Sequence, residues 1–351
     1  MPAKSKVFKL SDIELKGSMD VEEAAKAIFL GCAHHLKENF RQFKEEGDPL
    51  ALMQIRIGVR RMRVALYVFR TIIPKEVRVN FNREYRYFGN LLGDARNMDV
   101  FLDGTLRPDI KTKDFKTVSK ELLRLGEETR AEEYDIIIHE ISGGHFERLS
   151  KSFDKWLSGN WSAKLGRTAR KVMVGPIAPF ALSAIEEGNI DLLNQGAEVE
   201  NLSASELHDL RKYIKRSRYH LRFFSALFRK EKINEGFALL VKMQDYLGLI
   251  NDIKEGMIIL GRLSASVRAD YFADTLRFNA RLYKDASEEV EDNLKDTLAR
   301  IRGLCTRQER PEISELRLFT LSEGKRKHPE YVLFTVFLIF IQPDRHLFMP
   351  R

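Results

Sequence analysis

Cysteine is scarce in this sequence of 351 residues, which contains Cys32 and Cys305 and no others. Two cysteines cannot form a disulfide framework, and their neighbours do not have the pattern of a zinc site or a redox pair. A small disulfide-stabilised secreted domain is therefore excluded. We expect a protein of a reducing cytoplasm.

Long apolar runs are also missing. The longest run, 331–341, has 11 residues, whereas a helix that spans a bilayer needs about 20. The first thirty residues mix lysine with acidic residues, so we expect no cleaved signal peptide. We expect no membrane span, and we interpret 331–341 as a buried C-terminal segment rather than a membrane-surface contact.

Signatures of catalysis are absent as well. The sequence has no P-loop, no glycine-rich nucleotide fingerprint and no nucleophile elbow. Its histidines are not accompanied by carboxylates at metal-ligand spacing. We therefore expect that the protein is not an enzyme and uses no cofactor or metal, because a phosphohydrolase or phosphotransferase needs a general base or a metal.

Positive charge is present in excess and is unevenly placed. The chain has 59 Lys and Arg against 51 Asp and Glu, a net charge of +8. Residues 51–100 contain 10 basic and 4 acidic side chains, and residues 206–262 contain 12 and 7. The remainder is slightly acidic, so two basic blocks carry the excess. This concentration favours an anionic partner.

The two basic blocks are related by an internal repeat. The segment 56–63 (RIGVRRMR) aligns with 211–218 (RKYIKRSR) at an offset of 155 residues, and the Leu-Gly pair at 92–93 aligns with that at 247–248 at the same offset. We interpret this as a duplicated unit of about 150 residues with its seam in 159–205.

The secondary structure is predicted to be helical. Proline is absent from 180 to 310, and the alternation typical of strands is scarce. The segment from Ser203 to Glu206 has capping-box spacing, which predicts a helix start there. Further helices are predicted over 115–139, 232–262 and 266–302.

The predicted fold class is therefore all-α: a helical bundle of two pseudo-symmetric repeats, each an antiparallel four-helix unit. We place the first repeat at about 18–158 and the second at about 165–302. An N-terminal segment, 1–17, precedes them. A tail, 303–351, follows, and it either docks on the bundle or mediates homo-oligomerisation; the sequence leaves both open.

Viewed down its axis, the first motif helix carries one basic stripe. At 100° per residue, Arg60, Arg63 and Arg70 lie within about 40° of Arg56, with apolar residues on both sides. In the second block the stripe consists of Arg211, Lys215, Arg218 and Arg222. No acid occurs between 211 and 222 to relieve the repulsion, so we favour an anion-binding groove over an ordinary solvated face.

These motifs resemble those of the CHAD domain, the conserved histidine α-helical domain. The run 207–219 (LHDLRKYIKRSRY) followed by 247–252 (LGLIND) resembles its second half, and 56–63 followed by 92–100 (LGDARNMDV) resembles its first. The resemblance covers roughly 18–302. It implies two pseudo-symmetric helical halves around a basic central cleft or pore that binds inorganic polyphosphate, often in proteins of polyphosphate granules.

The resemblance also implies a set of phosphate-binding residues. They are Arg56, Arg60, Arg63, Arg96, His208, Arg211, Lys215 and Arg218, with Lys212, Arg216, Tyr219 and Arg222 as neighbours. This sequence departs from the family pattern at Met53, where the first-half histidine is usual, and at Asn97, where Asp is usual. One histidine of the pair is missing, which puts metal chelation in doubt.

Three roles remain open for His208: a phosphate donor, a packed residue without function, and a metal ligand or phosphoacceptor. For the whole protein we predict non-enzymatic binding of inorganic polyphosphate through the two stripes, in the cytoplasm and at polyphosphate granules. The alternative is a protein that binds nucleic acid or another phosphorylated polyanion through the same charge, although the stripe lacks the interleaved Asn, Gln and aromatic residues of base recognition.

Overall fold

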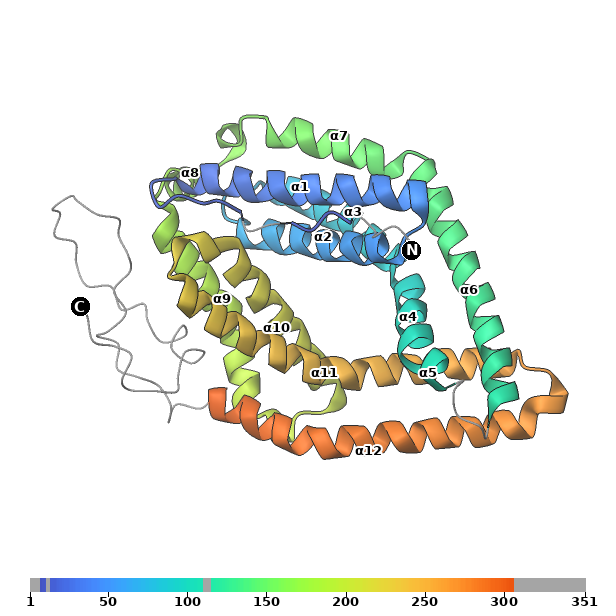
Figure 1. The fold of residues 1–351 in the computed structure, drawn as a ribbon. Helices are drawn as coiled ribbons and strands as arrows, with labels where there is room; N and C mark the ends of the chain where they lie inside the picture. The colour runs from blue at the N-terminus through green and yellow to red at the C-terminus, as the bar shows by residue number, and fades with distance from the viewer. Residues whose placement is uncertain (1–6, 11–12, 110–114, 306–351) are drawn as a thin grey trace.

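The computed structural model describes residues 7–10, 13–109 and 115–305 (Figure 1). The regular elements of these residues are helices, and no strand occurs among them. The all-α class predicted from the sequence is confirmed. The predicted buried segment 331–341 lies outside the described residues.

Five α-helices and one π-helix form the first part of the chain. They are α1 (Val21–Glu46), α2 (Pro49–Val68), α3 (Lys75–Leu91), α4 (Gly93–Phe101), the π-helical η1 (Leu102–Leu106) and α5 (Arg107–Asp109). The middle of the chain contains α6 (Lys116–Ser142), α7 (His145–Leu157), η2 (Ser162–Lys164) and α8 (Arg167–Met173). The last part contains α9 (Ile177–Ala197), η3 (Val199–Asn201), α10 (Ala204–Phe224), η4 (Ser225–Leu227), α11 (Lys230–Ala265), η5 (Ala269–Tyr271) and α12 (Phe272–Cys305).

Local sequence signals set several of these boundaries. Ser203 caps α10 and exchanges hydrogen bonds with Glu206, which confirms the capping box and helix start predicted there. Asp20 and Glu23 form the same box at the start of α1. Gly47 ends α1 with φ of 61°, a left-handed conformation that glycine adopts without strain. The helix predicted from 266 begins later, at Phe272.

The long helices recur at a nearly constant spacing. The starts of α2 and α10, and those of α3 and α11, are 155 residues apart, while those of α1 and α9, and of α6 and α12, are 156 apart. This spacing is what a duplicated four-helix unit predicts. The duplication itself remains an inference from the sequence motifs and from this spacing.

The two sets of helices differ at one instructive point. α11 runs unbroken for 36 residues, whereas the matching stretch of the first set is divided into α3 and α4 at Leu92 and Gly93. A helix break changes the backbone path and makes carbonyl groups available to outside donors. The break therefore makes the two halves chemically unequal.

The two sets of helices meet where α2 and α10 pack against each other (Figure 1). α1 packs on α2, α9 packs on α10, and α2 contacts α10 directly. α4 and α6 run from the α1–α2 layer to the α11–α12 pair. A large core joins the two halves, and a smaller apolar cluster around Phe101, Leu122 and Phe278 joins α4, α6, α11 and α12. In the described part of the chain, no helix is long and apolar enough to cross a membrane.

Candidate functional site

The basic stripes of α2 and α10 lie on two helices that pack against each other. Each stripe is bordered by fully buried apolar residues, such as Ile55 and Met62 on α2 and Leu210 and Ile214 on α10. Because these residues anchor the helices in the core, the rotation of each helix is fixed. The cationic side chains emerge beside the core, half-buried, rather than on a convex outer surface.

Arg60 lies among the cations of both helices. Its positive charge lowers the pKa of five cations, and in each case burial lowers that pKa more. These cations are Arg56 and Arg63 of α2, and Arg211, Lys215 and Arg218 of α10. These five shifts have Arg60 in common, so Arg60 lies close enough to the cations of both stripes to act on each of them.

Lys215 shows the strongest effect of this crowding. Burial first, and then the charges of Arg60 and Arg211, lower its pKa to about 6. Among the described residues, no carboxylate lies within ion-pair distance of its Nζ, although Asp252 acts on it from further away. Lys215 is therefore mostly neutral at neutral pH, and an arriving anion would favour its charged form.

Arg56 binds the break between α3 and α4. Its Nη1 donates to the carbonyl oxygens of Gly93, at 2.9 Å, and Leu92, at 3.3 Å. Burial, with the nearby charges of Arg60 and Arg96, lowers the Arg56 pKa to about 10. Two site residues predicted from the sequence, Arg56 and Arg96, are thus brought together from different helices.

Arg211 occupies the matching place in the second half. Its Nη2 approaches Gly248 of α11, the counterpart of Gly93, and lies 3.7 Å from Oδ1 of Asp252. α11 is unbroken at this point, so its backbone offers no free carbonyl as α4 does. In the described part of the chain, the buried Nε atoms of Arg211 and Arg218 have no hydrogen-bond acceptor. Buried donors without acceptors are costly, so an anionic ligand would satisfy them.

The later cations of the two stripes, Arg63, Arg218 and Arg222, contact residues of α3 and α11. Nε of Arg63 donates to Oδ1 of Asn82 at 3.1 Å, and Arg218 donates to the side chain of Gln244. The guanidinium groups of Arg218 and Arg222 lie over the ring of Phe237, at 5.0 and 5.4 Å from its centroid. Tyr219, beside Arg218, is half-buried.

Several basic residues of the motifs do not join this site. Arg216 pairs with Asp191 of α9 at 2.6 Å and lies over Tyr67. Lys212 is exposed and pairs with Asp209 at 2.7 Å. Arg70, which the helical angle places in the stripe, pairs instead with Glu187 of α9. These side chains stabilise helix packing or lie in solvent.

His208 lies at the start of α10, exposed, beside Asn251 of α11. Partial desolvation of its ring by the neighbouring residues is the largest cause that lowers its pKa, followed by the charges of Lys212 and Arg211. This position is compatible with a neutral phosphate donor at the rim of the site. Within the described residues, no group of three or more His, Cys, Asp or Glu is placed to hold a metal.

Other contributors were missed by the helical-wheel argument because they lie on different helices. Arg86 of α3 is exposed, and its charge lowers the pKa of Arg63, after burial. Asn82, Gln244 and Phe237 position stripe arginines from α3 and α11. The signal available in the sequence is the basic and polar character of 80–90. Tyr85 and Phe88 pack in the core.

The fold and the site together define an all-α protein with two facing cationic helices. The sequence profile of the CHAD domain matches residues 27–257, more than half of the chain, and the chain belongs to the CHAD domain family.

Two solved structures share the fold. The crystal structure of the CHAD domain from the plant Ricinus communis superposes with a TM-score of 0.70 at 24% identity, covering 84% of this chain and 94% of that chain. PptA from Streptomyces chartreusis superposes with a TM-score of 0.59 at 14% identity, covering 81% and 99%. No curated protein sequence matches the chain.

Proposed function

We propose that this protein binds inorganic polyphosphate through the facing stripes of α2 and α10, without changing it chemically. The observation that carries the proposal is the position of Arg60, whose charge lowers the pKa of cations on both helices, after burial. Cations that repel one another in a half-buried site are unfavourable without a ligand. A polyanion would reverse that penalty.

The geometry suits a linear anion with evenly spaced charges. Successive stripe positions on a helix are about 5–6 Å apart, and a planar guanidinium can donate two hydrogen bonds to phosphate oxygens. Residues such as Arg60 and Arg63 therefore form a ladder of phosphate donors. Membership of the CHAD domain family is consistent with this ligand.

We propose that the polymer is bound without turnover, because most of the stripe side chains are arginines. Arginine is charged throughout the physiological range and donates hydrogen bonds, so it does not act as a general base. His208 lies at the rim of the site, not among the stripe cations. We therefore propose retention of the polymer rather than its hydrolysis, and residence of the protein at polyphosphate granules.

The test is a titration with polyphosphate of defined length at several salt concentrations, with free phosphate monitored and duplex DNA as competitor. Affinity should fall steeply with salt because binding releases counterions. DNA at equal phosphate concentration should not displace the polymer, and no phosphate should appear. Displacement by DNA or phosphate release would contradict the proposal.

The site itself is tested by reversing three stripe charges, in the variant Arg211→Glu/Lys215→Glu/Arg218→Glu. We expect this variant to lose binding while its far-ultraviolet circular dichroism stays helical. The matched control is Lys120→Glu/Lys155→Glu/Lys171→Glu, which changes the net charge equally at exposed positions outside the site. If the control loses binding to the same extent, overall charge rather than the stripes determines binding.

A further inference from the structure

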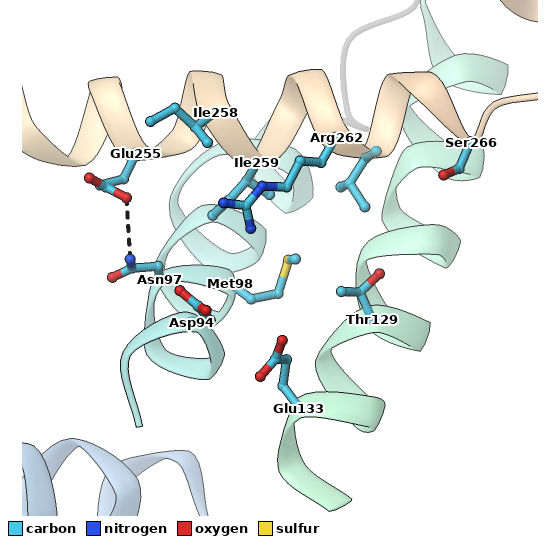
Figure 2. Close-up of a pocket in the computed structure, with 11 residues that line it drawn as sticks. Asp94, Asn97, Met98, Thr129, Glu133, Glu255, Ile258, Ile259, Arg262 and Ser266 are labelled. Carbon is cyan, nitrogen blue, oxygen red and sulfur yellow. Dashed lines mark hydrogen bonds between the residues drawn. The ribbon is translucent and has the colours of Figure 1, made fainter. Parts of the chain in front are cut away.

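An acid-lined pocket lies next to the break between α3 and α4 that Arg56 binds. It lies between α4, α6 and α11, has a volume of about 170 Å³, and is lined by Asp94, Glu133, Glu255 and Arg262 among others (Figure 2). Figure 2 shows that Asp94 and Asn97 come from α4, Glu133 from α6, and Glu255 and Arg262 from α11. Oε2 of Glu255 accepts a hydrogen bond from Asn97 at 3.3 Å, which ties α4 to α11.

The carboxylates of α4 and α11 lie next to the groups that Arg56 and Arg211 contact. Asp94 follows Gly93, whose carbonyl oxygen is 2.9 Å from Nη1 of Arg56. On the opposite helix, Oδ1 of Asp252 is 3.7 Å from Nη2 of Arg211, and Glu255 lies one turn further along α11. We call Asp94, Asp252 and Glu255 the acidic boundary.

The opposite end of the site has a different composition. Arg63 on α2, and Arg218 and Arg222 on α10, come after Arg56 and Arg211 along their helices, and Arg86 of α3 adds a positive charge that acts on Arg63. Asp245 acts on Arg218 without coming within ion-pair distance among the described residues. The charge of the site therefore changes along its length. It is acidic where α4 meets α11, and basic toward Arg86 of α3 and Phe237 of α11.

This polarity constrains an extended polyanion. A phosphate placed beyond Arg56 and Arg211 would approach the carboxylates of the acidic boundary, two of them exposed and Glu255 half-buried, and like charges repel each other. Leaving past Arg63 and Arg222 brings further phosphates toward cations. The boundary thus opposes threading in one direction only.

We propose that the acidic boundary ends the polyphosphate site at the α4–α11 side, so that a fixed run of phosphates is bound and the rest of the chain leaves past Arg63 and Arg222. This inference rests on the proposed function and adds to it a determinant of length and direction. The polymer is held at one terminus or as a single short run, and it does not pass through.

The experiment compares affinities across a series of polyphosphate lengths for the wild-type protein and for Asp94→Asn/Glu255→Gln. Glutamine at 255 keeps an amide oxygen for Asn97, and Asp94 is exposed, so both changes are compatible with the fold. In the wild type, affinity per chain should rise with length and then level off. In the variant it should continue to rise, and the salt dependence for long chains should steepen by about one to two units of slope.

The matched control is Glu46→Gln/Asp135→Asn, which removes two exposed acidic charges away from the site. It should level off at the same length as the wild type. The single variant Asp94→Asn serves as a second test, with an intermediate shift expected. The inference is overturned if the wild type shows no plateau, or if the boundary variant and the control behave alike. A wild type that does not bind polyphosphate at any length contradicts the proposed function itself, which is a distinguishable result.

Discussion

Val21 and Ile177, the first residues of α1 and α9, each donate a backbone hydrogen bond to the residue two positions before the other. The N–H of Val21 donates to the carbonyl oxygen of Gly175 at 3.0 Å, and the N–H of Ile177 donates to that of Met19 at 3.1 Å. The donors are 156 residues apart, and so are the acceptors. The two bonds are reciprocal, so the starts of α1 and α9 are tied to each other in the same way from both sides.

Similar positions in the two halves need not have similar protonation. Arg60 and Lys215 correspond at the 155-residue offset, and the Lys215 pKa is lowered to about 6 by burial, then by Arg60, Arg211 and Arg56, against a weaker opposing effect of Asp252. At pH 7.5 we expect polyphosphate binding to take up protons, because the ligand favours charged Lys215. Affinity should fall as pH rises above about 6.

Calorimetry in buffers of different ionisation enthalpy measures this uptake. In Lys215→Arg the position is charged throughout, so the uptake should decrease and the affinity should depend less on pH. The pKa of His208 is also lowered, by partial desolvation and by neighbouring cations, so we assign to His208 the proton uptake that remains in Lys215→Arg. Equal uptake in the wild type and in Lys215→Arg would contradict the prediction.

Two neighbouring arginines of α10 should have separable roles. Arg218 lies in the site with Gln244 and Phe237, whereas Arg216 pairs with Asp191 of α9. We expect Arg218→Gln to weaken polyphosphate binding by about tenfold, the effect of roughly one charge-assisted contact, with little change in stability. Arg216→Gln should lower the free energy of unfolding and leave the affinity nearly unchanged. Titration and urea denaturation of both variants measure the difference, and parallel losses of affinity would refute it.

The sequence was sufficient for the stripes because periodicity alone determines which side chains share a helix face. The helical angle also places Arg216 outside the stripe, because Arg216 lies 140° from Arg211 on an ideal helix. Only the family resemblance includes Arg216, as a neighbour of the phosphate-binding residues. Both stripes could therefore be predicted without a structure.

Tertiary pairing could not be predicted in this way. Arg70 belongs to the stripe by angle, but Glu187, on a helix 117 residues away, removes it from the site. The helix break before Gly93 could not be predicted from the sequence either. Gly248 is a glycine at the matching position of the second half, and it lies within an unbroken helix. In both cases the deciding interaction is between distant parts of the chain, which local propensity does not encode.

The crowded lysine should reduce the stability of the free protein. Between about pH 6 and its unfolded pKa near 10.5, Lys215 binds fewer protons in the folded state than in the unfolded state, so its penalty is largest at and below pH 6 and shrinks as pH rises. Lys215→Met should therefore raise the free energy of unfolding by about 1–3 kcal/mol at pH 6, and by less at pH 9.

Urea denaturation of the wild type and of Lys215→Met at both pH values tests this expectation. Lys212→Met is the matched control, since Lys212 is exposed and paired with Asp209. It should leave stability nearly unchanged at both pH values. A loss of stability in Lys215→Met at pH 6 would show that the lysine is not destabilising in the folded state.

Asp99 of α4 is expected to be the carboxylate on which the framework of the site depends most. Its side chain is 1% exposed, and it accepts hydrogen bonds from Nε of Arg130 at 2.7 Å and from the hydroxyl of Tyr134 at 2.9 Å, with Arg96 at 3.8 Å. These contacts hold α4 against α6. Asp99→Asn should lower the free energy of unfolding by about 3 kcal/mol, because Arg130 is left half-buried without its countercharge.

The matched control for this last prediction is Asp103→Asn on η1, where the carboxylate is exposed and pairs with Arg107. That exposed pair is expected to contribute little to stability. Because Asp99→Asn removes negative charge beside Arg96, protein that remains folded should bind polyphosphate no more weakly than the wild type. Equal urea midpoints for the two variants would mean that packing alone holds α4 in place. A large loss of affinity in folded Asp99→Asn would mean that this carboxylate positions Arg96 for the ligand.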